Sequence, residues 1–220
     1  TALHSAVKEN KPEHVSELMC FAQRVRDPLS FLELSNKLGE TALHSAVKEN
    51  KPESVRQLIS FVQYVGNPLS FLKRQNTVGE TALHIACKKA PKLLPLLMKD
   101  LSPVQKMDLL NQKNEKDETP LHIASRYNSL EVVEMLLTVF DGSESELKAY
   151  LKQVTSLGET VLHIACEKSP KSVPLLLKSL DAETKATFVK MQNNEGETAL
   201  YIASRSNSLE TVELLLAEFD

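Results

Sequence analysis

The chain has 220 residues, and its 26 Lys and Arg residues nearly balance its 29 Asp and Glu residues, which gives a formal net charge of −3. Charges scattered in this way argue against a nucleic-acid or membrane-surface protein, because such proteins usually concentrate basic residues in a patch or run. No apolar run approaches the ~20 residues needed to cross a bilayer, and we identify no signal peptide, so we expect no membrane insertion by this segment. Three cysteines without a CxxC pair indicate reduced thiols and a cytoplasmic location.

A short motif that begins with threonine returns along the whole chain. The threonines stand at positions 1, 41, 81, 119, 160 and 198, and two longer stretches, from residues 81 and 160, match closely at a spacing of 79 residues. In such a chain each unit packs on its neighbours. We therefore predict a single repeat domain, 1–220, that is a fragment of a larger protein and consists of repeats 1–40, 41–80, 81–118, 119–159, 160–197 and 198–220.

Each repeat begins with a pattern typical of two helices. The threonine can cap the first helix by accepting a hydrogen bond from a backbone N–H. In the second repeat Leu43, Ala46 and Val47 then form an apolar stripe at helical spacing. A polar break follows, and Pro52 stands where a first-turn proline is tolerated, before the apolar run SVRQLISFV. The pattern predicts a helix, a turn and a second helix.

The motif resembles the core of an ankyrin repeat. The stretch TPLHIA at 119–124, followed by NSLEVVEMLL from residue 128, is similar to that family's pattern, and the resemblance extends over all six repeats. The family's glycine two residues before the threonine is matched at four repeats and replaced once by Asp117, which tolerates a left-handed backbone; the four are Gly39, Gly79, Gly158 and Gly196. The family's aspartate five before the threonine is mostly asparagine here. The resemblance implies an all-α, ankyrin-type solenoid of helix pairs that binds other proteins.

The histidine three residues after the threonine is a candidate metal ligand, catalytic base or structural residue. Successive histidines lie one repeat apart, and packed helices stand roughly 10 Å from each other, too far to share a zinc ion with ~2 Å bonds. The resemblance implies that these histidines tie the first helix to neighbouring backbone, and Tyr201 replaces the sixth. We expect this structural role for His4, His44, His84, His122 and His163.

The repeats are longer than the usual 33 residues of the family. The excess precedes each new turn and contains N-cap signals, followed by a pair of bulky apolar residues, so we predict an added short third helix per repeat with a buried apolar pair. The expected N-caps are Asp27, Asn67, Ser102, Ser143 and Asp181, with capping boxes at 102–105 and 143–146, and the apolar pairs are Phe31-Leu32, Phe71-Leu72, Leu109-Leu110, Tyr150-Leu151 and Phe188-Val189.

Two repeats carry a pair of prolines near the start of the second helix, at Pro91 and Pro95 and again at Pro170 and Pro174. Because a proline inside a helix removes a backbone hydrogen bond, we expect the second helix to start about one turn late, or to bend, in these repeats only. Either a solvent-accessible notch forms there, or Leu93, Leu94 and Val173 repack the space; we favour repacking.

The sequence lacks the common signatures of catalysis. It has no Gly-rich phosphate loop, no HExxH and no GxSxG, and the candidate nucleophiles lie within repeat helices. We therefore expect no enzymatic activity and no cofactor or metal.

Surface positions of the repeat remain as candidates for recognition. The residue before the threonine is always Glu, and the residue seven after it is Lys or Arg in all repeats but one, so we expect surface ion pairs between them. The resemblance implies that partners bind the concave face, formed by the turn and the first helix. Its apolar tips, and Arg and Tyr at the centre of the chain, are typical of interface residues. The candidate partner-binding residues are Leu38, Val78, Lys88, Lys89, Lys116, Arg126, Tyr127, Leu157, Lys168 and Arg205.

The favoured function is a protein-interaction module or adaptor that binds a partner protein on the concave face as a monomer, without nucleic acid. The lysines weakly favour an acidic peptide. Two alternatives stay open: a structural spacer or self-associating segment of a larger catalytic or membrane polypeptide, and an ankyrin effector of an intracellular microbe acting in the host cytosol. Neither the partner nor the exposure of the apolar turn tips follows from the sequence.

Overall fold

The fold is all-α, an ankyrin-type solenoid built from helix pairs. The computed structural model describes residues 1–140, 142–178 and 180–218, and in these ranges the regular elements are helices, with two isolated β-bridges. The backbone contacts group the residues into two compact units, Thr1–Glu115 (unit 1) and Lys116–Asp220 (unit 2). The single domain 1–220 and its repeat boundaries stay a prediction, and each unit is described by itself.

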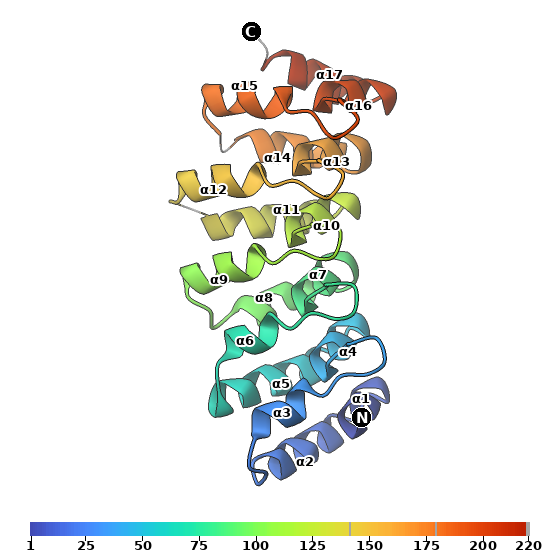
Figure 1. Ribbon diagram of the computed structural model, residues 1–220, viewed down its shortest axis with the longest axis vertical. Helices are drawn as coiled ribbons and strands as arrows, with labels where there is room; N and C mark the ends of the chain where they lie inside the picture. The colour runs from blue at the N-terminus through green and yellow to red at the C-terminus, as the bar shows by residue number, and fades with distance from the viewer. Residues whose placement is uncertain (141, 179, 219–220) are drawn as a thin grey trace. The chain divides into compact units, whose positions relative to one another are not determined.

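Unit 1 contains three repeats, each with the predicted order of helices (Figure 1). The first helices α1, α4 and α7 pack side by side in a row, and the second helices α2, α5 and α8 form a row next to them. The elements are α1 Ala2–Lys8, α2 Pro12–Ala22, α3 Pro28–Glu33, α4 Ala42–Lys48, α5 Pro52–Val65, α6 Pro68–Leu72, α7 Ala82–Lys89, the 3-10 helix η1 Pro91–Leu93, α8 Leu94–Met98 and α9 Pro103–Leu110.

Unit 2 repeats the arrangement with α10, α13 and α16 as the row of first helices. Their apolar faces form part of its core, since Leu121, Leu162 and Ile202 are each at most 2% exposed. The elements are α10 Pro120–Arg126, α11 Leu130–Leu137, the 3-10 helix η2 Thr138–Phe140, α12 Glu144–Leu151, α13 Val161–Lys168, the 3-10 helix η3 Pro170–Ser172, α14 Val173–Lys178, α15 Ala182–Lys190, α16 Ala199–Arg205 and α17 Leu209–Leu216.

The added third helix is confirmed by α3, α6, α9, α12 and α15. In unit 1, α3 and α6 each pack against α5, and α6 packs against α9. The predicted apolar pairs are buried, except that Phe31 is only half-buried. Four of the five predicted caps also form, because the side chains of Asp27, Asn67, Ser102 and Asp181 accept a hydrogen bond from a backbone N–H of the first turn.

The predicted capping box at Ser143 is wrong. Ser143 directly precedes α12, but its side chain makes no capping hydrogen bond, and its backbone has φ −120° and ψ 63°. Ser102, which does form a capping box with Gln105, has φ −64° and ψ 160°. An N-cap side chain reaches the first turn from such an extended backbone, so the different backbone angles at Ser143 remove the bond.

Both proline pairs shorten the second helix as predicted. A 3-10 turn comes first in each case, and the α-helix starts only at Leu94 or Val173. Both of these residues are completely buried, so the predicted repacking is confirmed. In unit 2 a notch is present as well, a pocket of about 310 Å³ lined by Pro170, Lys171, Val173, Pro174, Glu210, Thr211 and Leu214.

Candidate partner-binding surface

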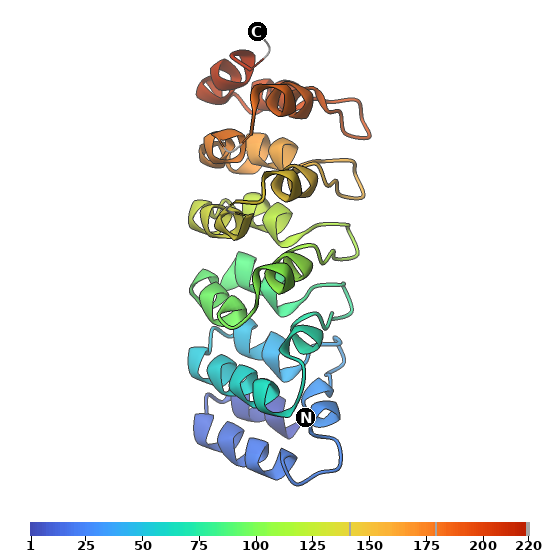
Figure 2. The same ribbon diagram turned by 90° about the vertical axis from the view of Figure 1, so that its left-hand side faces the viewer.

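The tight turns before α4, α7 and α16 are each built on one asparagine, and the turn before α13 is built on Thr155. The side-chain oxygen of Asn36 accepts hydrogen bonds from the backbone N–H groups of Leu38, at 2.8 Å, and Glu40, at 3.1 Å. Gly39 has φ +68°, a left-handed conformation that glycine adopts without strain. Asn76 makes the same two bonds to Val78 and Glu80. The turns therefore hold their tip residues in a defined position, and in each unit they protrude along one edge (Figure 2).

Backbone hydrogen bonds also join the tip of one turn to the next. In unit 1 the carbonyl of Leu38 accepts from the Thr77 N–H at 3.0 Å, and the carbonyl of Val78 accepts from the Glu115 N–H at 3.1 Å. In unit 2 Ser156 N–H donates to the carbonyl of Lys116, and Asn194 N–H donates to that of Leu157. Adjacent turns are thus tied together through their backbones, which leaves the side chains at the tips available.

The apolar tip side chains are exposed, which answers the question that the sequence left open. The exposed fraction is 53% for Leu38, 49% for Val78 and 63% for Leu157. Tyr127, at the end of α10, is 55% exposed. These four predicted site residues are accessible in their respective units.

A pocket of about 250 Å³ lies between two turns of unit 1 and brings four of the predicted site residues together. We call it the tip pocket. Two tips and the C-terminal ends of α4 and α7 surround it, and its lining residues are Leu38, Glu40, Lys48, Asn76, Thr77, Val78, Glu80, Ile85, Lys88 and Lys89. The lining combines apolar side chains with charged ones.

Most charges of the tip pocket are already paired, as predicted. The ammonium group of Lys48 lies 2.6 Å from the Glu40 carboxylate, and that of Lys88 lies 2.6 Å from Glu80. Burial alone would raise the pKa of Glu40, but the hydrogen bonds from Lys48 and Asn36 outweigh it and lower the pKa below its ordinary value. Lys89 is exposed and forms no ion pair within the part of the chain that the structure describes.

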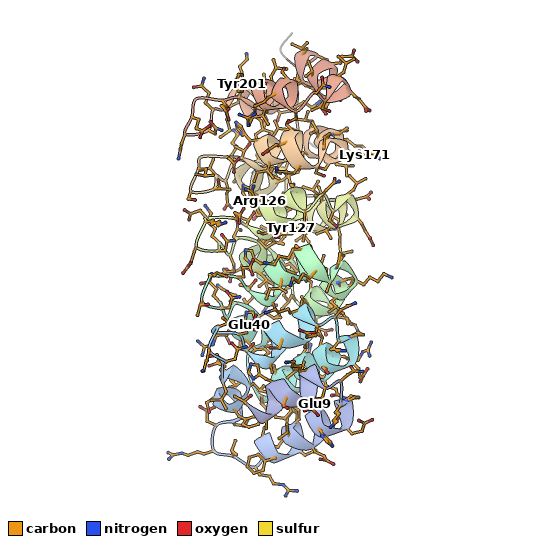
Figure 3. All side chains as sticks on the ribbon, turned by 90° about the vertical axis from the view of Figure 1, so that its right-hand side faces the viewer. Glu9, Glu40, Arg126, Tyr127, Lys171 and Tyr201 are labelled. Carbon is orange, nitrogen blue, oxygen red and sulfur yellow. The ribbon has the colours of Figure 1, made fainter. Side chains whose placement is uncertain are left out.

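In unit 2 the corresponding cations are all engaged. Arg126, which is labelled in Figure 3, donates to the carboxylates of Glu118 at 2.6 Å and Glu159 at 3.1 Å. One guanidinium therefore joins the turns of two repeats. One repeat carries Glu167 at the position where the others have Lys or Arg. Glu167 forms an ion pair with Lys168 at 2.9 Å. Arg205 likewise pairs with Glu197. The role of these three predicted site residues in binding a partner stays a prediction.

The repeated histidines have the structural role that the resemblance implied. In His44, Nδ1 lies 3.1 Å from the Thr41 backbone nitrogen and 2.8 Å from its hydroxyl, and Nε2 lies 3.1 Å from the Glu80 carbonyl oxygen. His163 has the same Nδ1 contacts with Thr160, and its Nε2 lies near the carbonyl oxygens of Met191 and Glu197. Each of these rings therefore joins its own helix N-terminus to the backbone that precedes the next repeat.

The two interior cysteines are buried, and their thiols are not activated for reaction. Cys87 and Cys166 occupy equivalent positions on α7 and α13 and are buried, and burial raises the pKa of the Cys166 thiol to about 12. No group of three or more His, Cys, Asp or Glu side chains within the described ranges could hold a metal ion. Every helix in those ranges is too short or too polar to cross a membrane.

Sequence reasoning missed three features of this surface. The asparagines at 36 and 76 hold the turn tips, a role that their recurrence five residues before the threonine could have indicated. Lys89 has no ion-pair partner among the described residues, whereas Lys168 at the same repeat position has one; the Glu167 that precedes Lys168 was the available signal. The tip pocket depends on how two turns pack, for which the sequence carries no signal.

The chain belongs to the ankyrin repeat family. A family model described as ankyrin repeats (3 copies) matches residues 65–149 and 139–220. Among curated proteins, the chain is 36% identical over 111 residues to the nuclear factor NF-kappa-B p105 subunit of Rattus norvegicus, covering 50% of this chain and 10% of that protein. It is 36% identical over 109 residues to the human NF-kappa-B inhibitor alpha, covering 49% of this chain and 32% of that protein.

Two solved structures share the fold along nearly the whole chain. The structure of EF0377, an ankyrin repeat protein, has a TM-score of 0.74 at 20% identity and covers 100% of this chain and 98% of its own. A chain in the structure of the Bd0816 predatory endopeptidase from Bdellovibrio bacteriovorus in complex with the immunity protein Bd3460 has a TM-score of 0.69 at 23% identity, covering 99% of this chain and 97% of its own. At these identities the two structures establish the fold alone.

Proposed function

We propose that the chain is a non-catalytic protein-interaction module whose partner docks on the tip pocket of unit 1. The observation that carries the proposal is the exposure of Leu38 and Val78 on turns that hydrogen bonds hold in place. Exposed apolar side chains beside charged groups are what a soluble protein uses to bind another one. Because the turns are already ordered, binding there would immobilise little further backbone.

The relatives support a binding role of the same general kind. One is named as an inhibitor of NF-kappa-B, and one structural neighbour comes from a complex that contains an immunity protein. The family as a whole typically binds proteins. For this chain we propose a protein partner in a cytoplasmic compartment, bound by the monomer and without a cofactor.

A capture experiment with matched variants tests the proposal. The purified chain would be immobilised and exposed to lysate, beside a Leu38→Asp, Val78→Asp double variant and a Leu157→Asp variant. The double variant should lose the captured protein, because each substitution puts a carboxylate where the partner's apolar surface would dock. Leu157→Asp changes an equally exposed tip of unit 2 and should leave capture intact. Equal capture by all three proteins would contradict the proposal.

A second candidate function, self-association, is favoured by apolar side chains on the last two described helices. Tyr201 of α16 is 56% exposed, and Leu209 and Leu216 of α17 are 71% and 49% exposed. The two helices pack against each other, and exposed apolar side chains on neighbouring helices are candidates for a surface that another protein covers. Light scattering of the purified chain checks this candidate: a dimer that Leu209→Asp dissociates would support self-association, and a monomer at every concentration would exclude it.

A further inference from the structure

We propose that the tip pocket binds an extended partner segment in which a large apolar side chain stands next to a carboxylate, and that Lys89 binds that carboxylate. The inference rests on the proposed function, because it names the chemistry of the segment that would dock there. Three observations support it: the volume of the pocket, the ion pairs among its lining residues, and the different charge pairing of the equivalent residues in unit 2.

The apolar part of the pocket fits a side chain more closely than a free small molecule. Leu38 and Val78 line it from two neighbouring turns, and Ile85 lines it from α7. Its volume of about 250 Å³ lies below the range typical of drug-sized ligands, ~300–1,000 Å³. A pocket of this size takes one large apolar side chain of a partner, whose main chain then runs along the turns.

The charges of the pocket favour an acidic neighbour for that side chain. Three lysines and two glutamates line it, and two of the lysines are bound to the two glutamates at 2.6 Å. One positive charge, that of Lys89, is left without compensation among the lining residues. A partner carboxylate beside the apolar side chain would complement it, whereas a partner lysine would meet an uncompensated like charge.

The equivalent residues of unit 2 lack this preference. Lys168 stands at the same repeat position as Lys89, eight residues after the threonine, but Glu167 lies 2.9 Å from it and neutralises it. Glu167 stands at the repeat position that Lys88 occupies in unit 1, seven residues after the threonine. An exposed leucine is present in both units, so the difference in charge confines the acidic preference to unit 1.

A random-peptide phage library, panned on the full 220-residue chain, tests the inference even while the natural partner is unidentified. The enriched peptides should contain Asp or Glu next to Leu, Ile, Met or Phe. Binding of one synthetic enriched peptide would then be measured by fluorescence anisotropy. We expect it to bind the Lys89→Glu variant about tenfold more weakly, because the substitution replaces an attraction with a repulsion, and to bind more weakly at high salt.

The control is Lys168→Glu, which introduces the same charge at the equivalent position of unit 2 and should leave affinity unchanged. A peptide with its acidic residue changed to lysine should recover affinity for Lys89→Glu. Enriched peptides without acidic residues, equal losses in the two variants, or no enriched peptide would overturn the inference. The proposed function has its own test. If capture depends on Leu38 and Val78 but not on Lys89, the proposed docking surface stands and the proposed acidic residue of the partner is wrong.

Discussion

The imidazole of His44 reaches the backbone carbonyl of Glu80, 36 residues further along the chain, with its Nε2 at 3.1 Å from the oxygen. On the other side of the ring, the Thr41 N–H donates to Nδ1 at 3.1 Å. A backbone N–H can only donate, so Nδ1 carries no proton and the proton of the neutral ring is on Nε2. A second proton on the ring would break the bond to Thr41.

This geometry predicts that acid destabilises the fold at a mild pH. Burial lowers the pKa of both His44 and His163 below the ordinary value of 6.5. The unfolded chain therefore binds more protons than the folded chain below that pH, so the stability is fully present above about pH 6.5 and falls as the pH decreases toward the folded pKa values. The carboxylate of Glu40, whose pKa is lowered from 4.5, adds a loss only in more acidic solution.

Urea unfolding followed by circular dichroism between pH 8 and pH 5 checks this prediction. The free energy of unfolding should fall below about pH 6.5, and the fall should be smaller in a His44→Gln, His163→Gln double variant. His14 is exposed, and His14→Gln should retain the full fall. A free energy of unfolding that stays constant from pH 7 to pH 5 would show that these rings tolerate protonation.

Alanine substitutions at Gly79 and Gly196 would distinguish the cost of backbone strain from the cost of a steric clash. Their φ values are +74° and +76°, but a Cβ atom at Gly79 would lie 2.6 Å from the Glu115 nitrogen, whereas one at Gly196 would meet nothing within 4 Å. We expect Gly196→Ala to cost about 1 kcal/mol of stability, from the left-handed backbone alone. Gly79→Ala should cost more, because it also displaces the turn whose Val78 carbonyl accepts from Glu115.

Urea unfolding gives both free energies, and hydrogen exchange at the Glu115 amide localises the effect. That amide should exchange faster in Gly79→Ala and at the native rate in Gly196→Ala. Equal losses of stability in the two variants would mean that the turn shifts to accommodate the added methyl group.

The sequence predicted the fold well because the repeat made each element visible several times. The threonine cap, the histidine, the apolar pairs of the third helix and the prolines that shorten two helices each depend on interactions within one repeat or between adjacent ones. Ser143 shows where this reasoning stops, since a capping motif needs backbone angles that the chain does not adopt there.

The candidate site could be predicted only in part. Repeat position correctly placed Leu38, Val78, Lys88 and Lys89 at one surface, because equivalent residues of stacked repeats lie next to each other. The exposure of the tips depends on side-chain packing between turns, which no pattern of residues encodes. The ion pairs within each repeat were predicted, but the difference between Lys89 and Lys168 was missed, although Glu167 stands next to Lys168 in the sequence.

Arg126 holds two nearly buried carboxylates, so we expect its loss to destabilise unit 2. The side chains of Glu118 and Glu159 are only 6% and 13% exposed, and both accept from the guanidinium. Arg126→Ala should cost roughly 1–3 kcal/mol, because both carboxylates lose a charged hydrogen-bond donor.

Arg126→Lys is the control for this prediction, because lysine keeps the charge but cannot donate to both glutamates from a planar fork. Its stability by urea unfolding should fall between those of the native chain and Arg126→Ala. If Arg126→Ala were as stable as the native chain, water would replace the guanidinium at both carboxylates. In the native chain Arg126 could then bind a partner without loss of stability.

The three thiols provide a test of whether the chain unfolds as a single domain. Cys20 is exposed, whereas Cys87 in unit 1 and Cys166 in unit 2 are buried. Only a thiolate reacts rapidly with a disulfide reagent, and burial raises the pKa of both buried thiols, so the native chain should react promptly at Cys20 alone. The other two should react only as their own unit opens.

In a Cys20→Ser variant, labelling at increasing urea followed by mass spectrometry reports the opening of each unit separately. If 1–220 is one cooperative domain, Cys87 and Cys166 become reactive at the same urea concentration. A single transition is the expected result, because repeat arrays gain much of their stability from the interfaces between neighbouring repeats. Two well-separated transitions would contradict the single domain and would show instead that Thr1–Glu115 and Lys116–Asp220 are independent folding units.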